Sequence, residues 1–523
     1  MKKNLPPNEI SHIAIVELGG FLKDYTTTHF RMPRIGPVII GSLLEELGYN
    51  VKVFAEAVQE FDKKTLEYIC SADVVAMSVL TYGANRAYAL AKLIKQINRD
   101  SIIIMGDVHP TIMPEECLAY CDFVIRGEGD ETIVELLSYL EDGTAPALNQ
   151  IAGLSYWDEE QIIHNSNRER PKNVNVPADL SLVEGFVRPD LVSYIVEGRG
   201  SMSVVQASRG CPIACKFCLG SAILGKEYRA KDIERVLNNL NQIRSFNLGK
   251  GSVVFFIDNH FFINRQWTKA LLREIIAGGY DFRFIAFGQY FIGRDREMLD
   301  LLREAGFIRI FVGFESINPQ TLKDFNKKQS EAAMRECISV MHEHGVEIHG
   351  SFILGGETDD EEVAEATIQF ALDTEIMTAS FFSLTEYPFE SHDFIPATNV
   401  LPKRRLLADD LDYYNLNFVS FYPKLMKPSQ LQRKLISAYD RFFSPKRIAK
   451  SVLKGDYSRA YHRAIGYWGQ RKMIAQMRGY LPYLEVKERE KYTLENTLIE
   501  GNLDNGPSSF VNSTAFLYHQ IYG

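Results

Sequence analysis

Three cysteines spaced as Cys-x3-Cys-x2-Cys constrain this chain more than any other feature of its sequence. They are Cys211, Cys215 and Cys218, and they follow closely on a β-like run from Met202 to Ala207. Three thiolates on one tight loop can hold three irons of a 4Fe-4S cluster and leave the fourth iron open to another ligand. The spacing therefore predicts a metal-binding loop at the end of a strand.

A zinc knuckle, or a set of buried structural thiols, is the alternative for these three cysteines. Zinc usually takes four ligands, commonly as two separated pairs. No fourth cysteine stands nearby, and the closest histidines in the sequence are His164 and His260. The other four cysteines are scattered and form no disulfide framework, which favours a reducing, cytoplasmic location. They are Cys70, Cys117, Cys121 and Cys337.

The length of the chain predicts several domains. With 523 residues it is too long for one ordinary core, and two to four domains are expected. A hydrophobic content of 46% and a charged content of 24% are normal for a globular protein in water. No apolar run is long enough to span a bilayer, and the start has no signal-peptide pattern.

Residues 1–145 alternate strand and helix patterns. The expected strands are 13–18, 50–54, 74–79, 102–105 and 123–126, and helical patterns such as 38–47 and 85–97 lie between them. This alternation predicts a parallel, doubly wound, Rossmann-like sheet, whose ligands bind at the carboxyl ends of the strands. Those ends carry Ser78 to Gly83, Gly106 to Thr111 and Gly127 to Thr132.

Residues 196–400 repeat the alternation. The expected strands are 203–206, 253–257, 282–286, 309–313, 347–353 and 380–385. Six β/α units suit a partial (β/α)6 TIM barrel, whose functional groups stand at the carboxyl ends of the strands. That rule selects Asp258, Gln289, Glu315, Gly355 and Glu386. Each acidic residue among them could instead form a salt bridge at the barrel rim.

Several motifs of this core resemble those of the radical SAM (S-adenosylmethionine) enzymes. They are the three-cysteine loop with Phe217 before its last cysteine, Gly313-Phe-Glu-Ser316, and the glycine-bearing run Phe352 to Glu357. Many relatives carry Gly-Gly-Glu where this chain has Asp258-Asn-His260. In the family, the open iron chelates SAM, and reductive cleavage gives a 5'-deoxyadenosyl radical. The resemblance implies SAM contacts from Phe217, Asp258, Gln289, Glu315 and Gly355.

The N-terminal half resembles the cobalamin-binding domain that precedes many radical SAM cores. The resemblance rests on the loops Gly106-Asp-Val-His-Pro-Thr111 and Gly127-Glu-Gly-Asp-Glu-Thr132. In the family a second glycine usually stands where this chain has Asp107. The Asp-x-His-x-x-Gly motif of cobalt ligation is missing, so we expect His109 to hydrogen-bond its own loop and not cobalt. The implied cobalamin-contacting residues are Ser78, Thr81, Gly106, Asp107, His109, Gly127, Glu128 and Gly129.

The remaining segments are a connector at 146–195 and a mostly helical C-terminal domain at 401–523. Lys424 to Arg478 holds fourteen basic residues against Asp440 and Asp456, together with many aromatic residues. The first interpretation is a solvated face over an aromatic core that closes the barrel. The second is peripheral contact with anionic membrane lipids. The third, a nucleic-acid surface, is least favoured because the rest of the chain is acidic.

The combined architecture is similar to that of cobalamin-dependent radical SAM enzymes, most of which are methyltransferases. The resemblance implies three cofactors: a 4Fe-4S cluster, SAM and cobalamin. It implies that the adenosyl radical removes a hydrogen atom from an unactivated carbon, or occasionally acts at phosphorus, and that methylcobalamin supplies the methyl group. The substrate would be a small molecule or lipid, and the electron donor a low-potential flavodoxin or ferredoxin. No general base is assigned, because hydrogen abstraction requires none.

Two alternatives to this function remain. One is a radical SAM enzyme with an empty cobalamin-like domain that forms a ring or a C–C bond. The other is a non-catalytic iron–sulfur protein, although its cluster would normally carry four protein ligands.

Overall fold

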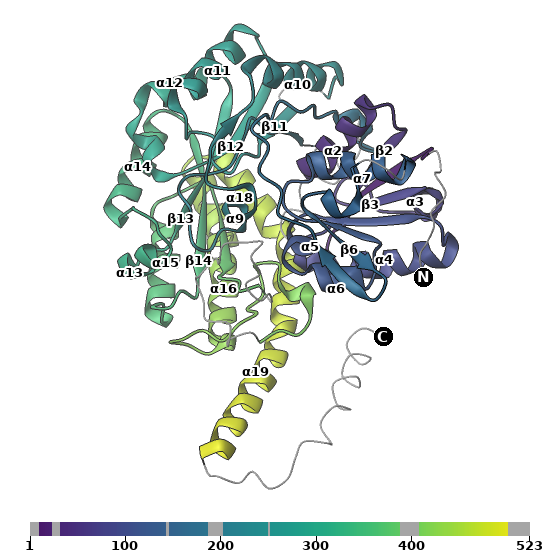
Figure 1. The fold of residues 1–523 in the computed structure, drawn as a ribbon. Coiled ribbons are helices and arrows are strands. Elements are labelled where there is room, and N and C mark those ends of the chain that lie inside the picture. The colour runs from purple at the N-terminus through teal and green to yellow at the C-terminus, as the bar shows by residue number, and fades with distance from the viewer. Residues whose placement is uncertain are drawn as a thin grey trace.

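The computed structural model describes residues 10–22, 32–142, 146–186, 202–248, 252–387 and 407–499. Two sheets, the first mainly and the second wholly parallel, lie side by side, each with helices against it, and the C-terminal helices lie against the second (Figure 1). The predicted α/β class, with a Rossmann-like first half and a partial barrel, is confirmed.

The first sheet has the strand order β2-β1-β3-β4-β5-β6-β7, and β1 to β5 are parallel. All five predicted strands form, while the β6–β7 hairpin adds two antiparallel strands at one edge. The hairpin comes from the segment expected to be a connector, so the sheet extends past residue 145. The strands are β1 (Ile13–Glu17), β2 (Val51–Ala55), β3 (Val74–Ser78), β4 (Ile102–Gly106), β5 (Phe123–Ile125), β6 (Leu154–Asp158) and β7 (Gln161–His164).

Strand β1 shows why these segments are nearly continuous apolar runs. All five of its residues are buried, because both faces of the sheet are covered. Alternate side chains enter two different cores, Ile13 and Ile15 on one face and Ala14 and Val16 on the other. The covering helices are α2 (Ile35–Glu46), α3 (Lys63–Ser71), α4 (Ala84–Ile97), α5 (Val108–Ile112), α6 (Pro114–Leu118) and α7 (Asp130–Asp142), with 3-10 turns η1 (Thr81–Gly83), η2 (Leu148–Gln150) and η3 (Leu180–Leu182).

The second sheet is the partial barrel, with the order β8-β11-β12-β13-β14-β15 and every pairing parallel. All six predicted strands are confirmed. They are β8 (Ser203–Val205), β11 (Ser252–Phe256), β12 (Phe282–Gly288), β13 (Phe307–Glu315), β14 (Glu347–Leu354) and β15 (Thr378–Ser383). A short antiparallel ribbon, β9 (Ser208–Arg209) with β10 (Arg229–Ala230), stands at the end of β8.

Capped helices connect the barrel strands. Asn264, Asp295, Ser330 and Asp360 each accept a hydrogen bond from the first turn of the helix that follows them, which fixes where that helix begins. The helices are α9 (Leu219–Leu224), α10 (Ile233–Ser245), α11 (Arg265–Ala277), α12 (Arg296–Glu304), α13 (Pro319–Asp324), α14 (Glu331–Glu343) and α15 (Glu361–Asp373), with η4 (Tyr290–Arg294).

The basic C-terminal segment lies against an acidic part of the barrel. Its helices are α16 (Pro428–Phe442), α17 (Pro445–Leu453), α18 (Tyr457–Gly469) and α19 (Arg471–Ile499), after η6 (Leu411–Tyr413). Ion pairs join Lys434 and Arg441 to Glu365, and Lys450, Lys454 and Arg459 to Glu375. Much of the basic charge thus fastens these helices to α15 and the turn after it, instead of forming only a solvated face. Among the described residues, no helix combines the length and hydropathy needed to cross a bilayer.

Candidate active site

The three-cysteine loop lies in the connection between β9 and β10. Gly210 has φ +83°, and a Cβ there would lie 1.9 Å from the Glu227 carbonyl oxygen, so only glycine fits the close approach of the two chain segments. The Cys211 amide donates to the Gly225 oxygen at 3.0 Å, and the Cys218 amide donates to the Cys215 oxygen at 3.1 Å. The backbone therefore holds the three cysteines on one compact loop.

The three thiols suit an iron–sulfur cluster. All three are free, and the charge of Cys218 acts on both Cys211 and Cys215, which places the three thiols close together. Burial raises the pKa of Cys215 to about 11, so binding a metal must drive its deprotonation. Within the described ranges, no three His, Cys, Asp or Glu side chains converge closely enough to hold a single metal ion. A cluster binds one cysteine at each of three separate irons, so it does not need such convergence.

A segment that the sequence analysis did not select braces this loop. The Asn326 side chain donates to the Ile213 and Ala214 oxygens at 3.0 and 3.1 Å. The Lys216 amide donates to the Phe325 oxygen, and the Phe217 and Phe325 rings meet edge to face at 5.1 Å. The predicted SAM residue Phe217 is thus fixed by the chain that follows α13.

Glu315 and Lys327 form a buried ion pair beside the cysteines. Lys327 Nζ lies 2.9 Å from Glu315 Oε1, and the two side chains are 4% and 8% exposed. Burial disfavours the ammonium, but the Glu315 carboxylate and the Cys215 sulfur outweigh it and raise the pKa of Lys327. Glu315 has φ +63°, a strained conformation that is typical of functional sites. The predicted SAM residue Glu315 is therefore also in a salt bridge, the alternative role considered for it.

Asp258 and His260 stand at the end of β11. Asp258 accepts hydrogen bonds from the Ser208 hydroxyl at 2.5 Å and the Ala207 amide at 3.2 Å, so it fastens β11 to the root of the cysteine loop. Burial raises the pKa of Asp258 to about 6. Burial, with Lys327 nearby, lowers the pKa of His260 to about 3, which keeps its ring neutral. Its Nε2 atom is buried and has no partner among the described residues.

The other two predicted SAM residues fall in different surroundings. Gln289 is half-buried and directly precedes η4. Gly355 has φ +99°, and a Cβ there would meet Leu431 at 2.7 Å and Phe421 at 3.1 Å. The sequence analysis assigned this glycine to the approach of SAM, whereas its missing side chain makes room for the C-terminal region.

The inner face of the partial barrel is aromatic. On β13, Phe311 and Gly313 are partly exposed, while the alternating residues Ile310, Val312 and Phe314 are buried in the helix-covered core. Phe287 on β12 is 36% exposed. The ring centroids of Phe255 lie 4.9 Å from Phe287 and 5.2 Å from Phe311. The barrel therefore offers accessible phenyl rings on the face opposite its helices.

The strand order of the first sheet places a ligand crevice between β1 and β3. The order 2-1-3-4-5 reverses there, and such a switch point is where open α/β sheets bind their ligands. Arg34 crosses it, donating to Asp107 Oδ2 at 2.8 Å, to the Ser78 oxygen at 2.7 Å and, from its amide, to Glu17 Oε2 at 2.6 Å. The charged groups at this edge therefore bond one another.

Asp107 occupies a glycine-type backbone conformation. Its φ of +86° and ψ of −159° belong to a region that L-residues avoid. Its carboxylate offsets this strain by accepting from the Val108 amide at the start of α5 and from the Ser78 hydroxyl, each at 2.7 Å. The backbone therefore keeps the shape for which the family uses a second glycine, and the Asp107 side chain adds a brace.

The expected role of His109 is corrected. Its ring does not bond its own loop: Nε2 lies 2.8 Å from the hydroxyl of Tyr88, on α4, and the residue is fully buried. Burial lowers the pKa of His109 to about 4, so the ring is neutral. The ring thus belongs to the packing of α4 beside the sheet, and the sequence offered no signal for this long-range partner.

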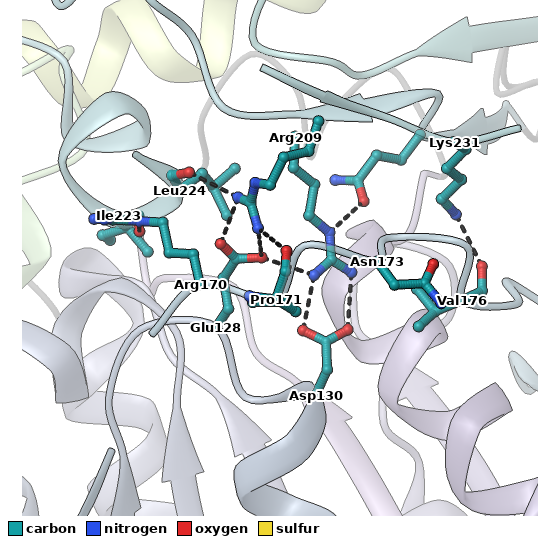
Figure 2. A network of polar contacts seen from close by, with 12 residues as sticks. Glu128, Asp130, Arg170, Pro171, Asn173, Val176, Arg209, Ile223, Leu224 and Lys231 are labelled. Carbon is teal, nitrogen blue, oxygen red and sulfur yellow. Dashed lines mark hydrogen bonds and ion pairs between the residues drawn. The ribbon is translucent and has the colours of Figure 1, made fainter. Parts of the chain in front are cut away.

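The carboxylate of Glu128, an implied cobalamin contact, is bound by Arg209 (Figure 2) and by Arg229, both from the barrel region. The groups at the carboxyl edge of the first sheet that remain to hydrogen-bond a large neutral ligand are backbone and hydroxyl groups. The buried Thr81 hydroxyl has no partner among the described residues, and the space beside the Cα of Gly127 is open. Together with Ser78, Gly106 and Gly129, these features fit the amide-bearing rim of a corrin.

Two family models match the chain in this arrangement. The model of the B12 binding domain matches residues 25–137, and that of the radical SAM superfamily matches residues 205–371. The first covers the sheet with the crevice, and the second covers the cysteine loop and most of the barrel.

Three curated relatives are similar over most of the chain. An uncharacterized methyltransferase of Pyrococcus horikoshii is 29% identical over 67% of this chain and 72% of its own. The anaerobic magnesium-protoporphyrin IX monomethyl ester cyclase of Cereibacter sphaeroides is 25% identical over 82% of this chain and 72% of its own. The bacteriochlorophyllide d C-12(1)-methyltransferase of Chlorobaculum tepidum is 26% identical over 73% and 76%.

The fold has a solved counterpart. The radical SAM methyltransferase TsrM of Kitasatospora setae, solved with cobalamin and a [4Fe-4S] cluster, superimposes with a TM-score of 0.64 at 14% identity over 90% of this chain and 99% of its own. The two matched models agree with the cobalamin, cluster and SAM that the sequence leads us to expect. The chain therefore carries a B12 binding domain and a radical SAM domain, combined in the fold of that methyltransferase.

Proposed function

We propose that this enzyme methylates an unactivated carbon of an apolar substrate, with a methyl group that reaches the substrate from SAM through cobalamin. The observation that carries the proposal is a cysteine loop and a cobalamin-type crevice in one chain, joined by direct contacts. When bound, the cluster and SAM supply a carbon-centred radical and cobalamin supplies the methyl group.

The residues of the chain hold and shape this site. Cys211, Cys215 and Cys218 would hold the cluster, with the loop braced by Asn326. Lys327 supplies a fixed positive charge beside the cysteines. The strand ends around Thr81 and Gly127 would bind the corrin rim. These groups orient the cofactors and exclude water, and hydrogen abstraction needs no side-chain base.

The aromatic inner face supports an apolar, and preferably flat, substrate. Phe287 and Phe311, backed by the buried Phe255, offer ring faces and edges, against which a flat apolar molecule packs well. The bacteriochlorophyllide methyltransferase among the relatives acts, by its name, on bacteriochlorophyllide d. A low-potential flavodoxin or ferredoxin would supply the electron.

Ring formation is the competing function, and the relative named as a cyclase favours it. The two functions differ in their products. A methyltransferase places the methyl group of SAM in the product and forms S-adenosylhomocysteine beside 5'-deoxyadenosine. A cyclase forms no S-adenosylhomocysteine and leaves the methyl group of SAM out of the product.

The test uses anaerobically reconstituted enzyme with methyl-deuterated SAM, hydroxocobalamin, a low-potential reductant and an apolar extract of the source cells. We expect a product that carries a trideuteromethyl group in place of one hydrogen, with S-adenosylhomocysteine. Formation of 5'-deoxyadenosine alone, with a product that lacks the label, would refute methyl transfer and support the cyclase. The Cys215→Ala enzyme, which lacks one proposed cluster ligand, is the negative control.

A further inference from the structure

One buried network of charges joins the loops that serve the two cofactors. On the cobalamin side it contains Glu128, in the loop after β5, and Asp130, the first residue of α7. On the cluster side it contains Arg209 and Arg229, which stand opposite each other on the β9–β10 ribbon. We call these four residues the clamp; Figure 2 labels three of them, Glu128, Asp130 and Arg209, which bridge the two parts of the chain.

The contacts are direct and directional. Arg209 binds Asp130 with both terminal nitrogens, at 2.8 and 2.9 Å, and Glu128 at 2.8 Å. Arg229 binds the other oxygen of Glu128 at 2.6 Å and also donates to the oxygens of Pro171 and Leu224 at 2.7 and 2.9 Å. Glu128 thus bridges two guanidiniums, and Asp130 accepts a bidentate fork, a geometry that fixes orientation as well as distance.

The four side chains of the clamp are buried, and their charges sum to zero. Its side chains are 4% to 10% exposed, and two cations face two carboxylates. Gln206 also accepts from Arg209 Nε at 3.0 Å, so that nitrogen is bonded as well. Buried pairs of this kind add little net stability over apolar packing, and their best-attested benefit is a unique arrangement of the parts they join.

Short, stiff connections lead from the clamp to both cofactor sites. Arg209 is separated from Cys211 only by Gly210, which is wedged against Glu227. In the other direction, the Gly127 amide donates to the Thr111 hydroxyl at 3.0 Å, and that hydroxyl donates to the Asp107 oxygen at 2.6 Å. A displacement of the cobalamin loop would therefore move the root of the cysteine loop.

We infer that the clamp couples the two cofactor sites: it positions the Cys211 loop according to whether the cobalamin loop is filled. Arg209 and Asp130 are positioning residues in this role and touch neither cofactor. Because such coupling is reciprocal, cobalamin binding and cluster assembly each favour the other.

The test compares hydroxocobalamin affinity, by absorbance titration under anaerobic conditions, for the full chain with and without its reconstituted cluster. For the native chain we expect the cluster to tighten cobalamin binding by a factor of about five to 150, the usual range of coupling. In Asp130→Asn, which loses charge but little volume, we expect a factor near one. Glu131→Gln is the matched control, because the neighbouring Glu131 is 55% exposed and pairs with Arg168 instead. It should keep the native factor.

A second readout covers variants that do not assemble a cluster. Hydrogen–deuterium exchange of peptides spanning 208–220 is followed on adding hydroxocobalamin to cluster-free protein. The native chain and Glu131→Gln should gain protection there, whereas Asp130→Asn and Arg209→Lys should not. A native coupling factor of one, or an equal factor in Asp130→Asn, overturns the inference. The assay uses no substrate, so its outcome is independent of whether the enzyme methylates or cyclises.

Discussion

The carboxyl edges of the two sheets use charge in opposite ways. At the edge of the cobalamin sheet, the acids Glu17, Asp107 and Glu128 are bound by arginines. At the edge of the barrel, the charged pair Glu315–Lys327 lies against the cysteine loop. The first edge neutralises its charges and leaves backbone for a large neutral ligand. The second places charge beside the loop that we propose holds the cluster.

The difference follows from the ligands. Corrin amides are recognised by hydrogen bonds, and an unpaired carboxylate beside them would carry a desolvation cost with no matching cation. A cluster with thiolate ligands is anionic, so a buried ammonium nearby favours its reduced form. We expect substitutions at the barrel edge to change redox chemistry and those at the cobalamin edge to change affinity and stability.

The largest effect is expected from the cysteines themselves. Cys211→Ala leaves two thiolates on the loop, too few for a stable cluster, so bound iron and SAM cleavage should fall to background. Iron content and visible absorbance after anaerobic reconstitution measure this. Cys70→Ala is the matched control, since Cys70 is a free, buried thiol on α3 in the other sheet. Iron retained at the native level in Cys211→Ala would exclude Cys211 as a ligand.

Lys327→Met should have the next largest effect. It leaves the Glu315 carboxylate buried and unpaired, a change that typically costs about 3–5 kcal/mol. Losing the positive charge should also make the cluster potential more negative. Urea unfolding and an EPR-monitored redox titration measure the two effects. Lys323→Met, at an exposed position four residues earlier, should change stability by less than about 0.5 kcal/mol. An unchanged potential in Lys327→Met would contradict the electrostatic role.

Asp258→Asn should change how stability depends on pH. The pKa of Asp258 is about 6 in the folded chain against an ordinary value of 3.8, because burial disfavours the carboxylate. The folded state therefore holds the proton more tightly. Its contribution to stability is full below about pH 4 and is lost as the pH rises through 6, by about 3 kcal/mol at most. The free energy of unfolding is measured for both proteins at pH 4.5 and pH 7. Relative to the native chain, Asp258→Asn should be more stable at pH 7 than at pH 4.5. Parallel pH profiles would contradict the raised pKa.

The strands and the cysteine loop were predictable because their causes are local. Alternating apolar runs gave all eleven predicted strands, and the spacing of Cys211 to Cys218 gave the loop. Other contacts join residues far apart in the sequence, so no local pattern predicts them. They are the Tyr88–His109 hydrogen bond, the clamp and the hydrogen bonds from Asn326. The sequence implies a SAM contact at Gly355 but does not reveal that Leu431 fills the space beside it.

The smallest effect is expected from two substitutions of Asp107, which separate backbone strain from the bonds of its carboxylate. Asp107→Gly and Asp107→Ala both lose the carboxylate bonds to Ser78, Arg34 and the Val108 amide, but only alanine keeps the strain of φ +86°. After allowing for the greater chain entropy of glycine when unfolded, the glycine variant should be more stable by about 1 kcal/mol. Urea unfolding of the two variants side by side measures this difference, and hydroxocobalamin titration shows whether the loop keeps its shape. If alanine proves as stable as glycine, the backbone at this position is not strained. The edge would then owe its form to the Asp107 side chain alone.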